Sequence, residues 1–409
     1  MVALPSCDMA DDDQYGAGAE GTDTIASQVA SICAMIDEHE AGETPMSAWR
    51  VAAISGMIDD VADAATAASE RRTISKMTSK LRHMRSTRCY EDLYTLGEGT
   101  TAVVTKARHL TTGQTVAMKT IHEGEAEACL SVHVGELLRE ACFMAACRGN
   151  PSVVDLHGVA RAPGTKNDYS LVMEHAGTSL DRVLGERVHR TGRPFSEPEA
   201  CRVMRQLLSG AAAMHEHGIV HRDIKTENVL VDSVGNVKIG DFGSAMSVEV
   251  AEKTGAGAYW SAGTTQYSAP EMLMETPGYD ARVDAWSVGC VMVELLIGEV
   301  LFNGNCDSDQ LYIIYDVLGV PGKKAWRPYE SSFVAGMVPL WRQEQQQQRR
   351  EGRWHGNLLR ELFPEEVLSD EGFKVLKGLL TCNPDERLTA AAALQLPWFA
   401  DNDNAPTEN

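Results

Sequence analysis

The segment from His221 to Gly243, which reads HRDIKTENVLVDSVGNVKIGDFG, constrains the fold of this chain more than any other stretch. Two short apolar runs, 229–231 and 237–239, flank the turn-forming sequence Ser-Val-Gly-Asn at 233–236. Apolar runs of this length on either side of such residues are typical of a tight β-hairpin. The segment therefore predicts a hairpin with polar loops at both ends.

Acidic and amide side chains stand in both predicted loops. Asp223 and Asn228 precede the first strand, and Asp241 follows the second. Mg²⁺ prefers carboxylate and carbonyl oxygens and usually keeps some ligand positions for substrate phosphates. The pattern predicts that Asn228 and Asp241 bind a divalent metal, where a phosphate and a hydroxyl meet. The alternative is a polar hairpin whose acids only cap turns.

The motifs HRD, Lys225, Asn228 and DFG occur in an order that resembles the catalytic core of eukaryotic protein kinases, which favours an enzyme over that alternative. The resemblance implies that Asp223 accepts the proton of the substrate hydroxyl and that Lys225 steadies the transferring phosphoryl group. It also implies that Asn228 and Asp241 hold Mg²⁺ against the phosphates of ATP.

Composition limits the alternatives. The 409 residues allow one two-lobed enzyme with an extension, and a net charge of −21 argues against nucleic-acid binding, which needs a basic surface. The ten cysteines include no C-x-x-C pair, so we expect reduced thiols in the cytoplasm or nucleus. We see no signal peptide. The apolar run 288–302 contains Glu294 and is too short to span a bilayer, so we expect a buried helix and no membrane contact.

The N-terminal 70 residues differ from the rest, with fourteen acidic residues and one basic residue, Arg50. Apolar residues at helical spacing predict two amphipathic helices, near 25–36 and 51–61. They either form a docking hairpin for a partner, or pack loosely on their own domain or are partly disordered. Residues 71–90 hold seven Lys or Arg and no acid, which fits a nuclear localisation signal or a solvated linker.

A glycine-rich turn opens the kinase-like region. By resemblance it covers the ATP phosphates, through Leu96, Gly97, Glu98, Gly99, Thr100, Thr101, Ala102, Val103 and Val104. Ala102 departs from the family's third glycine. The strand Val116-Ala117-Met118-Lys119 matches the family's V-A-I-K, which implies that Lys119 binds the α- and β-phosphates; a surface lysine is the alternative.

Further nucleotide contacts follow from the same resemblance. A glutamate on the next helix orients the lysine in the family, and we choose Glu140 over Glu136. The strand at 169–174 runs into a linker, so Met173 would be the gatekeeper. Backbone groups of Glu174 and Ala176 would bind adenine, and Ala117 would pack on the ring.

The activation segment extends from Asp241 to the Ala-Pro-Glu at 269–271. By resemblance, Thr264 bridges Asp223 and Lys225, which indicates serine/threonine specificity. The resemblance further implies that Glu271 pairs with Arg387 and that Asp284 braces the HRD backbone. Apolar spacing over 200–217 predicts a helix that Gly218 ends.

The segments 301–304 and 318–321 resemble cyclin-dependent kinases, which implies a cyclin or another activating subunit. The C-helix sequence VGELLRE, however, departs from the cyclin-docking PSTAIRE, and Gly263 and Ser268 depart from residues that favour proline after the phosphorylated site. The glutamine- and arginine-rich stretch 343–353 is expected to be a solvated loop.

Arg222 and Arg139 are cations that could receive a phosphate on the activation loop, but Met246 replaces a third arginine of the family. We therefore expect only a modest dependence on loop phosphorylation, with candidate acceptors at Thr254, Tyr259 and Ser261. Because residue 101 is threonine, inhibition by tyrosine phosphorylation in the glycine-rich loop is not expected.

Together these features predict an α+β bilobal protein kinase fold over 90–399, with a small β-rich N-lobe at 90–175 and a larger helical C-lobe at 176–399. Residues 1–89 would form an acidic, helical or partly disordered extension and 400–409 a short tail. The predicted activity is transfer of the ATP γ-phosphoryl group to serine or threonine of a protein substrate. The alternatives are a pseudokinase or scaffold without transfer, and an adaptor that acts through the N-terminal helices.

Overall fold

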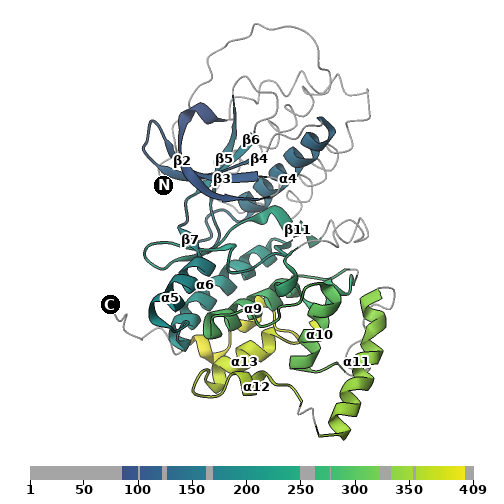
Figure 1. Ribbon diagram of the computed structural model, residues 1–409. Coiled ribbons are helices and arrows are strands. Elements are labelled where there is room, and N and C mark those ends of the chain that lie inside the picture. Colours follow the sequence, from purple (N-terminus) through teal and green to yellow (C-terminus); the bar gives the residue numbers. More distant parts are fainter. Residues whose placement is uncertain are drawn as a thin grey trace. The chain divides into compact units, whose positions relative to one another are not determined.

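The computed structural model describes residues 85–99, 102–121, 127–162, 169–248, 263–276, 278–321, 333–352 and 356–400 (Figure 1). The two helices predicted in the N-terminal extension, and most of the basic run after them, lie outside these residues. The chain divides into two compact units, one ending at Ala176 and the other beginning at Gly177.

The first unit is built on one sheet with the strand order β1-β5-β6-β4-β3-β2. Its elements are β1 (Arg85–Ser86), η3 (Thr87–Cys89), β2 (Tyr90–Glu98), β3 (Ala102–His109), β4 (Thr115–Ile121), α4 (Glu127–Ala146), β5 (Leu156–Arg161) and β6 (Tyr169–Glu174). All neighbouring strands are antiparallel except β1 and β5. In Figure 1, α4 lies beside this sheet.

The central strands of this sheet are apolar and the outer strand is not. β4 and β6 bury most of their side chains, as expected for strands rich in valine, leucine and methionine. In β2 only Tyr90 is buried, and Leu93, Tyr94 and Leu96 are exposed. The glycine-rich turn therefore joins an exposed strand to a partly buried one.

The second unit is mainly helical (Figure 1). Its helices are α5 (Leu180–Thr191), α6 (Glu197–Glu216), α8 (Pro270–Leu273), α9 (Arg282–Ile297), α10 (Asp307–Leu318), α11 (Phe333–Arg350), α12 (Leu359–Leu362), α13 (Asp370–Leu379) and α14 (Ala390–Ala393). Short 3-10 turns are η4 (Phe242–Ser244), η6 (Thr265–Tyr267), η7 (Pro384–Glu386) and η8 (Pro397–Phe399). The strands are β7 (Thr178–Ser179), β8 (Ile219–Val220), β9 (Val229–Val231), β10 (Val237–Ile239) and β11 (Met246–Ser247).

Helix α9 is the core of the second unit, because every residue from Val283 to Leu296 is buried. An apolar helix without a polar face must be surrounded by other elements. The prediction of a buried helix is confirmed, but its predicted end at Phe302 was wrong. The helix stops at Ile297, where Gly298 adopts a left-handed conformation, and the Phe302 ring returns to stack on Trp286 at 5.8 Å.

Helix α6 is confirmed, and it starts earlier than the apolar spacing alone predicts. Ser196 and Glu199 form a capping box, and Pro198 stands in the first turn, so the N-terminal N–H groups are satisfied locally. Its last residue is Glu216, and Gly218 follows with a positive φ of 67°. The chain then enters β8 directly before His221.

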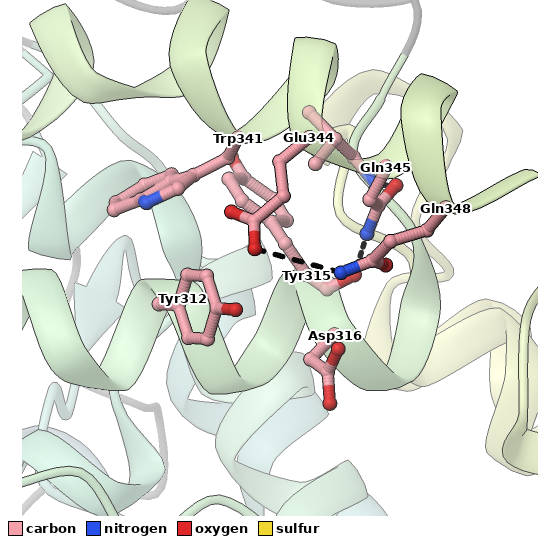
Figure 2. Close-up of a pocket in the computed structure, with 8 residues that line it drawn as sticks. Tyr312, Tyr315, Asp316, Trp341, Glu344, Gln345 and Gln348 are labelled. Carbon is pink, nitrogen blue, oxygen red and sulfur yellow. Dashed lines mark hydrogen bonds between the residues drawn. The ribbon is translucent and has the colours of Figure 1, made fainter. Parts of the chain in front are cut away.

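The stretch expected to be a solvated loop at 343–353 is instead helical up to Arg350, so that expectation was wrong. Glutamine and arginine are good helix formers, and Val338, Trp341 and Gln345 recur at helical spacing. Figure 2 shows side chains of α11 facing α10 across a small cleft. Gln345 is buried there, where it accepts from the Val320 N–H at 2.9 Å and donates to the Tyr315 carbonyl at 2.5 Å.

Among the residues that the model describes, no helix combines the length and the apolar character needed to cross a membrane.

Candidate active site

In the first unit, Lys119 of β4 is paired with Glu140 of α4. The Lys119 Nζ lies 2.9 Å from Oε1 and 2.8 Å from Oε2 of Glu140. The lysine side chain is 18% exposed and the glutamate side chain 4%, so water screens this ion pair weakly. Glu136, the other candidate, is exposed one turn earlier on the same helix. The pair fixes the lysine ammonium between β4 and α4.

The predicted phosphate-binding turn lies between β2 and β3. Gly97 and Glu98 pair with Val104 and Val103, and the Gly99 N–H donates to the Ala102 carbonyl at 2.8 Å. This bond closes the turn at the residue that departs from the family's third glycine. Thr100 and Thr101, also predicted to bind nucleotide, lie outside the described residues.

The predicted adenine contacts lie on the central strands of the same sheet. Ala117 of β4 is the register partner of Met173 of β6, and both are buried. The Glu174 N–H donates to the Asp155 carbonyl at 2.9 Å. A contact from Glu174 to a base would therefore use its carbonyl. Ala176, the last residue of this unit, is also buried.

In the second unit, the predicted hairpin is confirmed. β9 and β10 pair antiparallel, and Val229 faces Ile239. The Gly240 N–H donates to the Asn228 carbonyl at 2.9 Å, which extends the pairing to the residues just outside both strands. Asn228 and Asp241 are thus brought to the same end of the hairpin. Asp241 is exposed and has a positive φ of 59°, a strained value for a residue other than glycine.

Three predicted catalytic side chains form a closed triangle of hydrogen bonds. The Thr264 hydroxyl donates to Asp223 Oδ1 at 2.7 Å, and Lys225 Nζ donates to the Thr264 oxygen at 2.6 Å. Lys225 also pairs with Asp223 Oδ2 at 3.0 Å. Within the triangle the carboxylate is held by Thr264 and Lys225, and it stays partly exposed, so it is oriented without being closed off from a substrate.

Asn228 and Asp241 fit the chemistry of a Mg²⁺ site. The Asn228 amide nitrogen donates to the Asp223 carbonyl at 2.9 Å and to Asp223 Oδ2 at 3.0 Å. This orientation leaves the Asn228 side-chain oxygen for a hard cation, together with the exposed Asp241 carboxylate. Within the described ranges, no group of three or more His, Cys, Asp or Glu side chains could hold a metal. Two oxygen ligands suit a metal that is shared with phosphates.

The HRD backbone is braced by Asp284 of α9, as predicted. Its Oδ2 accepts from the His221 N–H and its Oδ1 from the Arg222 N–H, each at 2.8 Å. His215 Nε2 lies 2.9 Å from Oδ2. Burial alone would raise the pKa of Asp284, but the hydrogen bond and charge of His215 and the hydrogen bond from the His221 N–H outweigh it and hold the pKa below its usual value.

His221 links the two ends of the loop. The Asp223 N–H donates to His221 Nδ1 at 3.3 Å, so this nitrogen is the acceptor and Nε2 carries the proton, which goes to the Gly240 carbonyl at 3.0 Å. Its ring also packs edge-on against Phe242 at 5.0 Å. His221 therefore sets the spacing between Asp223 and the DFG residues.

Arg222 has partners that the sequence did not predict. Its Nε donates to the Ser244 carbonyl at 2.7 Å and its Nη1 to the Tyr279 hydroxyl at 3.2 Å. Met246, which replaces a family arginine, is buried in β11. The candidate phosphate acceptors Thr254, Tyr259 and Ser261 lie outside the described residues. Only a contact map could have revealed Tyr279, because it lies 57 residues from Arg222 in the chain.

The segment after these candidates is fixed by glycine and by an ion pair. Gly263 has a φ of +93°, and a Cβ there would lie 2.4 Å from the Arg222 carbonyl, so only glycine fits. The predicted pair of Glu271 and Arg387 is confirmed at 2.5 and 2.9 Å, with both side chains buried. Ser268 donates to the Thr264 carbonyl at 3.1 Å.

Comparison with known proteins identifies the family. The family model described as "Protein kinase domain" matches residues 90–399. The chain belongs to the protein kinase family. It is 44% identical over 330 residues to "Putative cyclin-dependent kinase F-2" of Oryza sativa subsp. japonica, which covers 78% of this chain and 91% of the relative.

Two further relatives place the chain in the same branch. It is 36% identical over 324 residues to "Cyclin-dependent kinase G1" of Arabidopsis thaliana, covering 77% of this chain but only 49% of that protein, so the chain spans about half of this relative's length. It is 33% identical over 314 residues to "Cell division control protein 2 homolog 3" of Trypanosoma brucei brucei, covering 76% and 92%. The chain is thus a cyclin-dependent-kinase-like, ATP-dependent serine/threonine protein kinase. The family generally uses ATP and Mg²⁺.

Proposed function

We propose that Asp223 accepts the proton of a serine or threonine hydroxyl on a protein substrate while the γ-phosphoryl group of ATP is transferred to that oxygen. The observation that carries this proposal is the triangle of Asp223, Lys225 and Thr264. Thr264 orients one carboxylate oxygen, and Lys225 supplies positive charge beside the other. Such fixed donors stabilise charge that develops during phosphoryl transfer without having to reorganise.

The remaining roles concern the nucleotide. Lys119, held by Glu140, would bind the α- and β-phosphates, and the turn from Leu96 to Val104 would cover them. Asn228 and Asp241 would hold Mg²⁺, which neutralises phosphate charge when bound. For adenine, Ala117 and Met173 offer an apolar surface, and the backbone of Glu174 and Ala176 would supply hydrogen bonds.

The organisation around the catalytic core is also a proposal. We assign the N-lobe to 90–175 and the C-lobe to 176–399, with 1–89 as an extension and 400–409 as a tail. A cyclin or another activating subunit would dock on the kinase, a partner suggested by the names of the relatives. The C-helix sequence VGELLRE favours a subunit other than a cyclin that recognises the PSTAIRE sequence. The scattered cysteines favour the cytoplasm or nucleus.

The test is radiolabelled phosphate transfer from Mg·ATP to generic serine/threonine substrates by the full chain, alone and with candidate cyclins. Asp223→Asn removes the proton acceptor at nearly constant volume, and we expect a loss of roughly 100-fold or more in kcat. Asp316→Asn is the matched control, because Asp316 is exposed on α10. Equal transfer by wild type and Asp223→Asn would refute the role of Asp223. ATP binding without any transfer would favour a scaffold.

A further inference from the structure

A buried carboxylate stands behind the catalytic loop in the second unit. Glu294 lies in the last turn of α9 and is 6% exposed. In the described part of the chain, no lysine, arginine or histidine forms an ion pair with it. Burial raises the pKa of Glu294, and the nearby charges of Glu227 and Asp181 raise it further. A carboxylate that is buried without a cation is costly, so its hydrogen-bond donors are the reason it is tolerated.

Two hydroxyl groups supply those donors. The Tyr267 hydroxyl donates to Glu294 Oε2 at 2.7 Å, and the Thr226 hydroxyl lies 3.1 Å from Oε1. A hydroxyl has one hydrogen to donate. The Tyr267 hydroxyl donates its hydrogen to Glu294, so it cannot also donate to the Thr226 hydroxyl oxygen, which lies 3.3 Å away. The Thr226 hydroxyl also lies 3.2 Å from Oε2 of Glu294 and 3.3 Å from Oε2 of Glu227, so Glu294 offers it the two nearest acceptors. The Glu294 carboxylate thus takes hydrogens from two different segments of the chain.

These two segments are the ones that carry the catalytic triangle. Thr226 follows Lys225 directly, and Tyr267 comes three residues after Thr264. Both are also fixed through their backbones. The Thr226 carbonyl accepts from the Asp181 N–H at 3.1 Å, and the Ser287 hydroxyl donates to the Tyr267 carbonyl at 2.8 Å. Glu294 is therefore a common anchor on both sides of the contact between Thr264 and Asp223.

The kinase pattern H-R-D-L-x-x-x-N leaves the residue at the Thr226 position unspecified, so the motif by itself assigns no role to this hydroxyl. We propose that Thr226 is a positioning residue, whose hydroxyl acts through Glu294 to keep the catalytic loop and the Thr264 segment in register. Thr226 is fully buried, so its side chain is not exposed to a substrate. The inference rests on the proposed role of Asp223 and adds what holds Asp223 against Thr264.

The experiment compares Thr226→Val, Tyr267→Phe, the double variant and Thr226→Ser. Valine and phenylalanine remove each hydroxyl with little change of volume, and we expect each to lower kcat roughly 5- to 10-fold, the size expected for one lost hydrogen bond. KM for ATP should change little, whereas the thermal midpoint should fall by a few degrees because the buried carboxylate loses a donor, and Thr226→Ser should restore both kcat and the midpoint. Because both hydroxyls act on one carboxylate, the double variant should lose much less than the product of the single losses.

Thr191→Val is the matched control, since the Thr191 hydroxyl also makes a hydrogen bond, to the Arg187 carbonyl, at the exposed end of α5. Its kcat should equal that of the wild type. The inference is overturned if Thr226→Val transfers phosphate at the wild-type rate, or if the losses of Thr226→Val and Tyr267→Phe multiply. If Thr226→Val folds poorly, the kcat of Tyr267→Phe still measures the loss of one hydroxyl, and the kcat of Thr226→Ser measures the effect of a substitution that keeps the hydroxyl.

A second readout does not depend on activity. Amide hydrogen exchange of Thr226→Val should be faster both in 223–228 and in 264–268, because the shared carboxylate couples the two segments. Faster exchange confined to 223–228 would overturn the coupling. If the wild type itself transferred no phosphate, the role of Asp223 would fail, whereas this exchange pattern would still decide the role of Thr226.

Discussion

The two ends of helix α9 hold one buried carboxylate each, and these carboxylates differ in what they receive. Asp284, in the first turn, accepts two backbone N–H bonds and one bond from His215, and its pKa lies below the usual value. Glu294, in the last turn, accepts from two hydroxyls among the described residues, and its pKa lies above the usual value. Burial raises both pKa values, so the donors together with the neighbouring charges decide the difference.

The position of each carboxylate along the helix shifts its pKa in the same direction as its surroundings do. The N-terminal end of a helix carries partial positive charge and favours a carboxylate, whereas the C-terminal end opposes one. Asp284 is therefore suited to fix a backbone permanently in one arrangement. Glu294 is a weaker anchor that joins side chains of two segments. The same helix thus supports the catalytic loop in two ways, one rigid and one adjustable.

The largest expected effect comes from weakening the first anchor. Asp284→Asn keeps one oxygen acceptor but points an amide donor at the other backbone N–H, which stays buried without a partner. Each buried donor left unpaired costs about 1–3 kcal/mol. We expect a loss of that size in the free energy of unfolding, measured by urea denaturation, together with at least a tenfold lower kcat.

Asp280→Asn serves as the control, because Asp280 precedes the same helix and is only partly buried, where its Oδ1 accepts from the Arg282 N–H. A loss for Asp284→Asn no larger than that of the control would contradict the view that this carboxylate anchors the HRD backbone.

The two anchors also show which contacts could be predicted from the sequence. The pattern of HRD, DFG and the buried apolar helix predicted the hairpin, the bracing by Asp284 and the pair of Glu271 with Arg387, because these contacts follow from motifs with known spacing. In the sequence, Glu294 stands out only because it interrupts an apolar run. Its partners Thr226 and Tyr267 could not be predicted, since their contacts depend on how three separate segments pack.

The errors have a similar origin. Composition at 343–353 suggested a loop because the residues are polar, yet Gln345 is buried by bonds to Val320 and Tyr315 that belong to tertiary packing. Tyr279 was likewise missed as a partner of Arg222. Its contact supports the expectation of a modest dependence on loop phosphorylation, because the arginine already has neutral partners.

An intermediate effect is expected from His215, the third donor to Asp284. His215→Phe keeps a ring of similar size but removes the hydrogen bond to Oδ2, while both backbone bonds remain. We expect a loss of about 1–2 kcal/mol in the free energy of unfolding near pH 7, measured by urea denaturation. The pKa of Asp284 should rise toward its usual value, so the stability that this group loses on acidification should be smaller in the variant than in the wild type and should level off at a higher pH. An unchanged acid profile would show that the two backbone donors alone hold the pKa down.

The smallest and most diagnostic effect is the pH dependence of Glu294. Since its pKa is raised in the folded state, folding favours the protonated form, and the stability from this group is fully present below the unfolded pKa of about 4.5 and is lost as the pH rises through the folded value. Glu294→Gln does not titrate. The stability of the wild type relative to this variant should therefore fall as the pH rises above about 4.5, by at most about 1.4 kcal/mol per pH unit, and then level off. Urea denaturation of both proteins at matched pH values measures this difference, and the shared titration of all other carboxylates cancels. A difference that grows with pH would mean that Thr226 and Tyr267 stabilise the charged form more than burial opposes it, and the two ends of α9 would then be alike.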